Sequence, residues 1–299
     1  MLTHTFRLGA LRCHSIEAGV QRLDGGAMFG VVPKPLWSRR ITPDDRNRIP
    51  LAMRCLLIEH PDGLVLIDTG LGNKEDAKFQ DIYGTTNAGA GGRTQLEDGF
   101  AELGHSPADV KWVVNTHLHF DHAGGNTYEE RDSHGAPVGG PWLSFPNAIY
   151  MVQWGDLDFA RHPNERTRAS YLPPNFEPVA QAGKWRLLQG DGEVLPGISV
   201  RVTPGHVPWH QAIIVRDGGE TLAYIADLVP TRHHLPLPWI MGYDVEPLRT
   251  LESKRTLLRQ VLDEGWWLFF EHDPEVVMGR LGAGEKGPEL TAPVPAPAR

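Results

Sequence analysis

The sequence predicts an α+β protein in which sheets and helices are stacked in layers. Short apolar runs typical of buried strands, two stretches with helical spacing and the turn residues between them support this class. The chain has 299 residues, of which 40% are hydrophobic and 22% are charged, as in an ordinary globular protein with a sizeable core. No repeat of about 20–50 residues is visible, so we do not expect a solenoid.

Strand-like runs occur along much of the chain, and two pairs of them are joined by clear turns. We expect a hairpin over residues 55–68, where Pro61-Asp62-Gly63 separates two apolar runs. A second hairpin is expected where Asp217-Gly218-Gly219 joins strands at 211–215 and 221–225. Further strands are predicted at 8–17, 110–114, 148–152, 198–202 and 266–270.

Two segments have the apolar spacing of helices, namely Thr94 to Leu103 and Pro247 to Glu264. No linker requires a second domain, so we expect a single domain over residues 1–281 that includes an N-terminal extension. The tail over residues 282–299 is rich in Gly, Pro and Ala, and this composition predicts disorder.

Charge and cysteine content restrict the partners and the compartment. The net charge is -8 with His neutral, which argues against nucleic acid or an anionic membrane as a partner. Two cysteines, Cys13 and Cys55, cannot build a disulfide scaffold and favour a reducing compartment. The first residues lack the features of a signal peptide, and no run approaches about 18 apolar residues. We therefore expect a cytoplasmic protein.

Histidine and aspartate side chains gather directly after the predicted strands. Four of them, His117, His119, Asp121 and His122, follow the strand at 110–114 within six positions. Later strands are followed by His206, Asp227 and His272. Taken alone, His206 is equally consistent with an ordinary turn residue, and His272 is better explained as one. Because a sheet fixes its strand ends, however, loops at one edge can bring all seven together, and imidazole and carboxylate are suitable metal ligands.

The segment from Thr116 to Gly125 resembles the signature of the metallo-β-lactamase superfamily. His206, Asp227 and His272 match the remaining ligands of that family in order and approximate spacing, and Leu66-Ile67-Asp68-Thr69-Gly70 is similar to its upstream motif. The resemblance covers residues 56–273. It implies a four-layer αββα sandwich with the site along the shared edge of the two sheets.

The same resemblance implies two divalent metal ions and a role for each ligand. His117, His119 and His206 would hold the first ion, Asp121, His122 and His272 the second, and Asp227 would bridge them. Asp68 would orient a ligand, although a turn after a strand explains it almost as well. Five His and two Asp ligands suit zinc, and manganese, iron and cobalt remain open.

A dinuclear centre of this composition favours hydrolysis. Two divalent ions, two carboxylates and a bridging hydroxide leave a single positive charge, which favours an anionic tetrahedral intermediate. Asp121 would additionally orient the hydroxide or move its proton. We predict that a metal-bridging hydroxide attacks a small-molecule ester or lactone.

Residues His117 to Asn126 resemble quorum-quenching N-acyl-homoserine lactonases, and the segments 30–37 and 227–231 resemble one branch of lactonase-like proteins. The well-studied lactonases carry a Tyr three residues after the bridging Asp, which helps polarise the lactone carbonyl, and here Pro230 stands there. His234 and Tyr243 are our candidates to replace it as catalytic donors. A solvated loop for His234 and a core position for Tyr243 are the ordinary alternatives.

Lactone opening is our leading functional prediction, and two alternatives stay open. One is a phosphotriesterase or other ester hydrolase of the same fold, since a more distant resemblance is to methyl parathion hydrolase. The other is a non-catalytic metal-containing sensor or interaction protein. The apolar segment 24–37, with Met28, Phe29, Val31 and Trp37, would line an acyl-chain pocket, contact a second subunit in a homodimer, or simply pack in the core.

Overall fold

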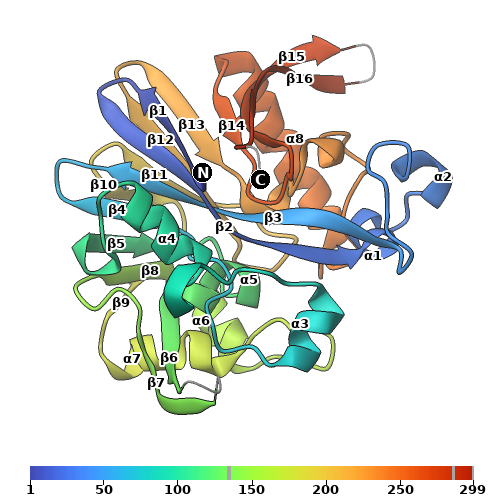
Figure 1. Ribbon diagram of the computed structural model, residues 1–299. Coiled ribbons are helices and arrows are strands. Elements are labelled where there is room, and N and C mark those ends of the chain that lie inside the picture. The colour runs from blue at the N-terminus through green and yellow to red at the C-terminus, as the bar shows by residue number, and fades with distance from the viewer. Residues whose placement is uncertain (133–135, 285–286, 298–299) are drawn as a thin grey trace.

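Two seven-stranded sheets lie face to face in the computed structural model of this chain, which describes residues 1–132, 136–284 and 287–297 (Figure 1). The first sheet has the order β1-β2-β3-β4-β5-β8-β9. Its strands are β1 (Thr3–Leu8), β2 (Leu11–Asp24), β3 (Arg48–Glu59), β4 (Leu64–Ile67), β5 (Val110–Val114), β8 (Ile149–Gln153) and β9 (Trp185–Leu188).

The second sheet follows in chain order from β10 to β16. Its strands are β10 (Gly192–Leu195), β11 (Ile198–Val202), β12 (Gln211–Asp217), β13 (Glu220–Tyr224), β14 (Trp267–Phe269), β15 (Val276–Gly284) and β16 (Gly287–Pro295). A separate two-stranded ribbon is formed by β6 (Thr127–Arg131) and β7 (Pro137–Leu143).

Alternate side chains of strand β12 contribute to two different apolar clusters. Ile213 and Val215 belong to the apolar cluster between the two sheets, whereas Ala212 and Ile214 pack with α8 (Pro247–Glu264) on the outer face. This alternation follows from the two-residue side-chain period of a strand. The buried run in the sequence therefore serves both faces of the second sheet.

Helix α4 (Gln95–Glu102) covers the outer face of the first sheet, where Leu96 and Phe100 join its apolar cluster. Thr94 and Glu97 form a capping box at its start, which satisfies free N–H groups there. The order of layers is thus helix, sheet, sheet, helix, and the predicted αββα sandwich is confirmed. The remaining helices are α1 (Gly25–Phe29), α2 (Lys34–Trp37), α3 (Ala77–Tyr83), α5 (Phe120–Ala123), α6 (Trp154–Arg161) and α7 (Glu177–Gln181).

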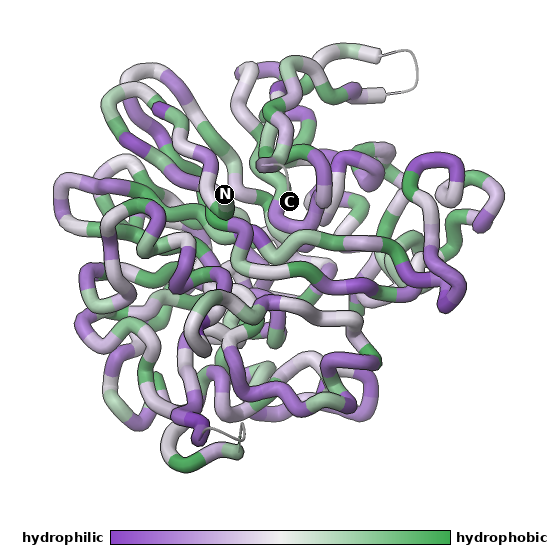
Figure 2. Tube along the Cα trace, in the orientation of Figure 1, coloured by the Kyte–Doolittle hydropathy of each residue, from purple (hydrophilic) through white to green (hydrophobic). Residues whose placement is uncertain are grey.

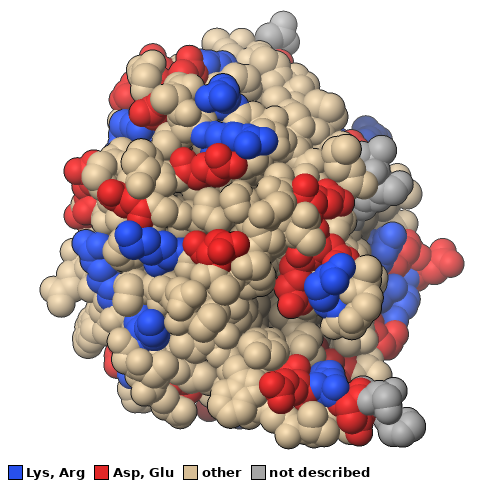
Figure 3. Space-filling view, turned by 60° about the vertical axis from the view of Figure 1, so that its left-hand side comes forward, with Lys and Arg blue, Asp and Glu red and all other residues tan. Residues whose placement is uncertain are grey.

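Figure 2 shows hydrophobic stretches along the strands of both sheets, while many peripheral loops are hydrophilic. On the face shown in Figure 3, acidic and basic side chains are interspersed and do not form a large patch of one sign. Within the described part of the chain, no helix is both long enough and apolar enough to cross a membrane.

Several predicted elements agree closely with the observed ones, because their patterns are strong. Strand β5 and helix α8 have the predicted bounds. The strand predicted at 8–17 is wrong at its start, because Gly9 and Ala10 form the turn that joins β1 to β2. Gly9 has a φ of 59°, a backbone conformation that glycine adopts at little cost.

The predicted disorder of the tail is wrong for the described residues beyond 281. Strand β15 runs through that boundary and pairs with β16, where Leu281 lies opposite Leu290. Prolines are tolerated in β16 because it is the edge strand of its sheet, where a missing N–H costs little. Residues 285–286 and 298–299 lie outside the described part. That residues 1–281 form a single domain stays a prediction.

The apolar segment 24–37 forms α1 and α2 and packs mainly as core. Phe29 and Trp37 are buried and stack with ring centroids 5.4 Å apart. Met28 is also buried. Val31, in contrast, is 93% exposed at the tip of the segment. Ordinary packing therefore accounts for most of this stretch.

Candidate metal centre

The ends of four strands deliver the seven predicted ligands to one edge of the sandwich. The loop after β5 and the short helix α5 carry His117, His119, Asp121 and His122. His206 follows β11, Asp227 lies in a single helical turn (Ala226–Leu228) after β13, and His272 follows β14. Convergence at the edge therefore comes from the sheet topology, as expected for loops at rigid strand ends.

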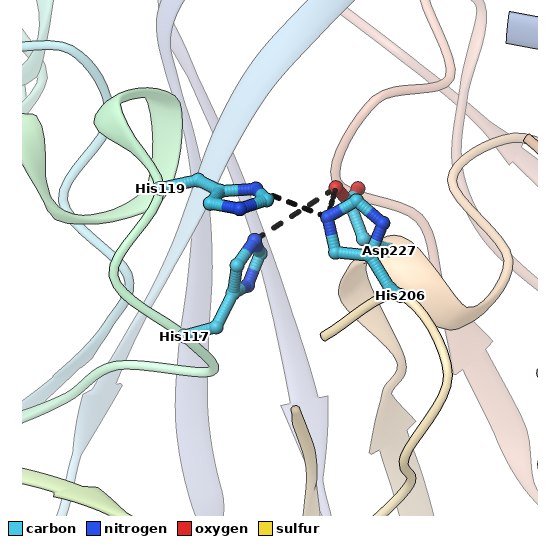
Figure 4. Close-up of side chains that lie close together, drawn as sticks. All are labelled: His117, His119, His206 and Asp227. Carbon is cyan, nitrogen blue, oxygen red and sulfur yellow. Dashed lines mark hydrogen bonds and ion pairs between the residues drawn. The ribbon is translucent and has the colours of Figure 1, made fainter. Parts of the chain in front are cut away.

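One group comprises His117, His119, His206 and Asp227, whose potential ligand atoms all lie within 4.8 Å of one another. Figure 4 shows the three rings approaching Asp227 from two sides. The Nε2 atom of His206 is 2.9 Å from Asp227 Oδ2 and 3.0 Å from His119 Nδ1. The Nε2 atom of His117 is 3.9 Å from the same carboxylate oxygen.

A second group comprises Asp121, His122 and His272, which also have ligand atoms within 4.8 Å. The Nε2 atoms of His122 and His272 are 3.2 Å apart. His272 Nε2 lies 3.0 Å from Oδ1 of Asp227, the oxygen that does not face His206. Asp227 is therefore placed between the two groups: Oδ1 lies next to His272, while Oδ2 lies next to His206 and 3.6 Å from His122 Nε2.

The arrangement of these side chains is better suited to binding two cations than to direct contacts among the side chains themselves. All seven are less than 9% exposed. Among the described residues, His117 Nε2 is buried in the cluster without a hydrogen-bond partner. Buried polar atoms are costly unless they are satisfied, and nitrogen atoms that face each other at 3.0 Å or 3.2 Å are well suited to share a metal ion. The donor set of imidazole and carboxylate agrees with this.

The electrostatics of the cluster point the same way. Burial and the neighbouring rings hold the pKa values of His117 and His119 well below the usual value, so both stay neutral as metal ligands must be. Burial also lowers the pKa of His206, but Asp227 and Asp244 outweigh it and raise that pKa to about 10. The carboxylates thus attract positive charge into the buried cluster.

Other groups contact the ring nitrogens of the ligands that do not face the cluster. Asp68 Oδ2 is 3.1 Å from His122 Nδ1 and accepts a hydrogen bond from Thr116 Oγ1. Asp244 Oδ1 is 2.9 Å from His206 Nδ1. The backbone carbonyl of Ala52 lies 2.7 Å from His272 Nδ1. Such contacts fix the tautomer and direction of a ligand ring.

Two residues at this edge have positive φ although they are not glycine. Asp68 has a φ of 52° and Ala226, directly before Asp227, has a φ of 41°. A residue with a Cβ pays a conformational cost in this region, and such strain concentrates at functional sites. The backbone is therefore bent to aim two carboxylates at the cluster.

Sequence reasoning missed several of these supporting side chains. Asp244 follows a loop with no ligand motif, and Gln21 lies on β2, about a hundred positions before the Asp121 carboxylate to which its Nε2 donates at 2.5 Å. Asp156 on α6 accepts from the N–H of Leu118, between the first two ligands.

A cavity of about 390 Å³ opens onto the cluster. Asp121 and Tyr243 line it, but His234 does not. His234 is buried instead, with Nε2 2.9 Å from the carbonyl of Met28 and its ring stacked on Phe29 at 4.5 Å. The structure thus contradicts our assignment of His234 as a catalytic donor, because both its position and its bonds are those of a core residue.

Known proteins resemble the chain in sequence and in fold. A family model described as the metallo-beta-lactamase superfamily matches residues 50–272. An N-acyl homoserine lactonase from a Bacillus species is 29% identical over 247 residues, which span 80% of this chain and 87% of the relative.

Two solved structures share the architecture. A probable metal-dependent hydrolase from Staphylococcus aureus superposes with a TM-score of 0.84 at 28% identity, covering 96% of this chain and 99% of its own. AidC, a dizinc quorum-quenching lactonase in complex with a product, gives a TM-score of 0.76 at 22% identity, covering 97% and 96%. The second likeness supports the fold alone. With three quarters of its length matched by the family model, the chain belongs to the metallo-beta-lactamase superfamily.

Proposed function

We propose that this protein is a dinuclear metal-dependent hydrolase that opens lactones, with N-acyl-homoserine lactones as its substrate class. The observation that carries the proposal is the pair of buried ligand groups that share Asp227 beside a cavity. The lactone is suggested by the relative from Bacillus, which is named an N-acyl homoserine lactonase.

Each group of ligands would hold one ion. The first would bind His117, His119 and His206, the second Asp121, His122 and His272, and Asp227 would bind both. We favour zinc, because neutral imidazoles and carboxylates suit it. Bound there, two divalent ions would lower the pKa of water and polarise a carbonyl group.

Asp121 is the residue placed to manage a proton. It lines the cavity, and the amide of Gln21 donates to its Oδ2 and so fixes the orientation of the carboxylate. A carboxylate fixed at this edge can accept the proton of the attacking water and deliver it to the leaving alcohol oxygen. Gln21 acts through Asp121 and is a positioning residue.

Tyr243 is the donor that we assign to the substrate carbonyl. It lines the cavity, and burial together with the charge of Asp24 raises its pKa to about 12. The phenol therefore keeps its proton near neutral pH and can donate a hydrogen bond. It would supply the function for which Pro230 has no polar group.

Part of the cavity wall is apolar and suits an acyl chain. This part comprises Leu23, Ala27, Met28, Leu51 and Met241. An elongated substrate that lies on this wall would exclude water from the reacting end. A protein that only senses metal has no need of such a cavity beside its ligands.

The test is to incubate zinc-loaded protein with N-hexanoyl-homoserine lactone and to measure the ring-opened acid by liquid chromatography and mass spectrometry. We expect ring opening that is lost on chelation and restored by zinc. A phosphotriester is assayed on the same preparation. Absence of lactone turnover, or a greater kcat/KM for the phosphotriester, would contradict the proposal.

A further inference from the structure

Arg166 is a cationic side chain in the wall of the cavity at the metal centre. It lies in the loop after α6 and is exposed at the rim. Among the described residues that line the cavity, it is the one Lys or Arg, and the lining also includes the apolar side chains of Leu23, Met28 and Leu51. A lone cation is unusual in the lining of a cavity that would only accommodate a hydrocarbon chain.

The direction of the guanidinium is fixed by backbone atoms. Its Nη2 donates to the carbonyl of Gly242 at 2.5 Å and to that of Asp244 at 3.3 Å. Both acceptors are neutral, so these contacts orient the group without cancelling its charge. Arg166 therefore links the loop after α6 to the loop at 241–245.

Several N–H groups of the Arg166 guanidinium have no acceptor among the described residues. A guanidinium carries five N–H groups, and both side-chain contacts use Nη2. Within residues 1–132, 136–284 and 287–297, no carboxylate forms an ion pair with Arg166 and no protein acceptor meets its Nε or Nη1. Three N–H groups are thus available to a ligand.

The position of Arg166 relates these donors to the metal centre. Asp244, whose carbonyl it contacts, holds His206 through its carboxylate at 2.9 Å. The guanidinium is therefore anchored to the segment that orients a ligand of the first group. Arg166, His119 and His206 line the same cavity, so one substrate can contact both the guanidinium and the ligand cluster.

The chemistry that complements this arrangement is a hydrogen-bond acceptor between a reacting carbonyl and an apolar tail. An amide carbonyl next to the lactone ring is such an acceptor. Resting on the proposed function, we propose that Arg166 determines specificity by donating to the amide carbonyl of N-acylated lactones. The planar guanidinium suits this role better than the ammonium group of lysine, which lacks a fixed fork of donors.

Two lactones separate this role from simple support of the loop. One is N-hexanoyl-homoserine lactone, and the other is α-heptyl-γ-butyrolactone, which has a substituent of equal length at the same ring carbon but no amide. We expect Arg166→Met to lower kcat/KM about 10-fold for the amide-bearing lactone and to leave the alkyl lactone nearly unchanged. Arg166→Lys is expected to fall between Met and the wild type.

The matched control is Arg168→Met. Arg168 is an exposed arginine two residues away that pairs with Glu165 and does not line the cavity, so both lactones should be unaffected. An equal loss for both lactones in Arg166→Met would show that Arg166 only supports the loop, and no loss for either would also overturn the proposal.

Failure of the proposed function has a different signature. If the zinc-loaded wild type opens neither lactone, that function is wrong, and calorimetric Kd values for the same two compounds then test Arg166 alone. The proposal requires Arg166→Met to weaken binding of the amide-bearing lactone selectively. Equal weakening of both, or no binding of either by the wild type, would overturn it.

Discussion

The metal-ligand edge and the wall of the cavity are built on different principles. Candidate ligands such as His122 and His206 are buried, lie in the short segments after β5 and β11, and are each contacted by an aspartate. The polar wall residues Arg166 and Tyr243, in contrast, come from loops, and Tyr243 is 38% exposed. The rigid edge therefore determines the class of reaction, whereas the loops determine which substrate is accepted.

The largest effect is expected at the residue shared by both ligand groups. Asp227→Ala removes an oxygen from each group, so we expect fewer than two bound metal ions per chain and a loss of kcat/KM on the order of 1,000-fold. Elemental analysis and the lactone assay measure the two quantities. Asp158→Ala, at an exposed aspartate of α6, serves as the control. Full activity with two bound ions would exclude the shared role.

A smaller effect on metal binding is expected for the aspartates that contact the ligand rings. Asp244→Asn weakens the support of His206, and we expect metal affinity to fall about 10- to 100-fold. Competition with a chromophoric chelator gives the affinity of each position. Asp68→Asn should weaken the other position instead, because Asp68 contacts His122. If both variants weakened the same position, the assignment of the two groups would be wrong.

The wall is tested by Tyr243→Phe, which removes one hydroxyl group and little volume. We expect kcat for the lactone to fall about 10-fold, with both metal ions retained, because one hydrogen bond to the carbonyl is lost. Steady-state kinetics and metal analysis on the same sample measure this. An unchanged kcat would remove Tyr243 from the catalytic residues.

The smallest effect on catalysis is expected at His234. His234→Ala should change kcat by less than about twofold, but it should lower the free energy of unfolding by about 2–4 kcal/mol, since a buried ring is deleted against Phe29. Urea unfolding monitored by tryptophan fluorescence measures the loss. A tenfold drop in kcat at full metal content would restore His234 as a catalytic residue.

The clustering of the candidate ligands was predictable because the signal is local. His117 to His122 follow a buried strand within a few positions, and β5 has the bounds that its apolar run predicts. The order of the later ligands then followed from strands with clear patterns. Asp68 was also found, since it ends β4 in a recognisable motif and contacts His122 as expected.

The rest depends on contacts between distant segments. Nothing near Gln21 in the sequence indicates that β2 passes beside Asp121, and nothing near Asp244 indicates that its loop reaches His206. Strand β16 was missed because Gly and Pro lower strand propensity, while its pairing with β15 is a tertiary effect. His234 was misassigned because nearness in sequence to Asp227 does not place a side chain in the cavity.

The most direct test of the two-ion centre is an anomalous diffraction measurement at the zinc edge on crystals of the zinc-loaded protein. We predict two peaks, one bound by His117, His119 and His206 and the other by Asp121, His122 and His272, with Asp227 contacting both. A single peak, or peaks away from these side chains, would contradict the account.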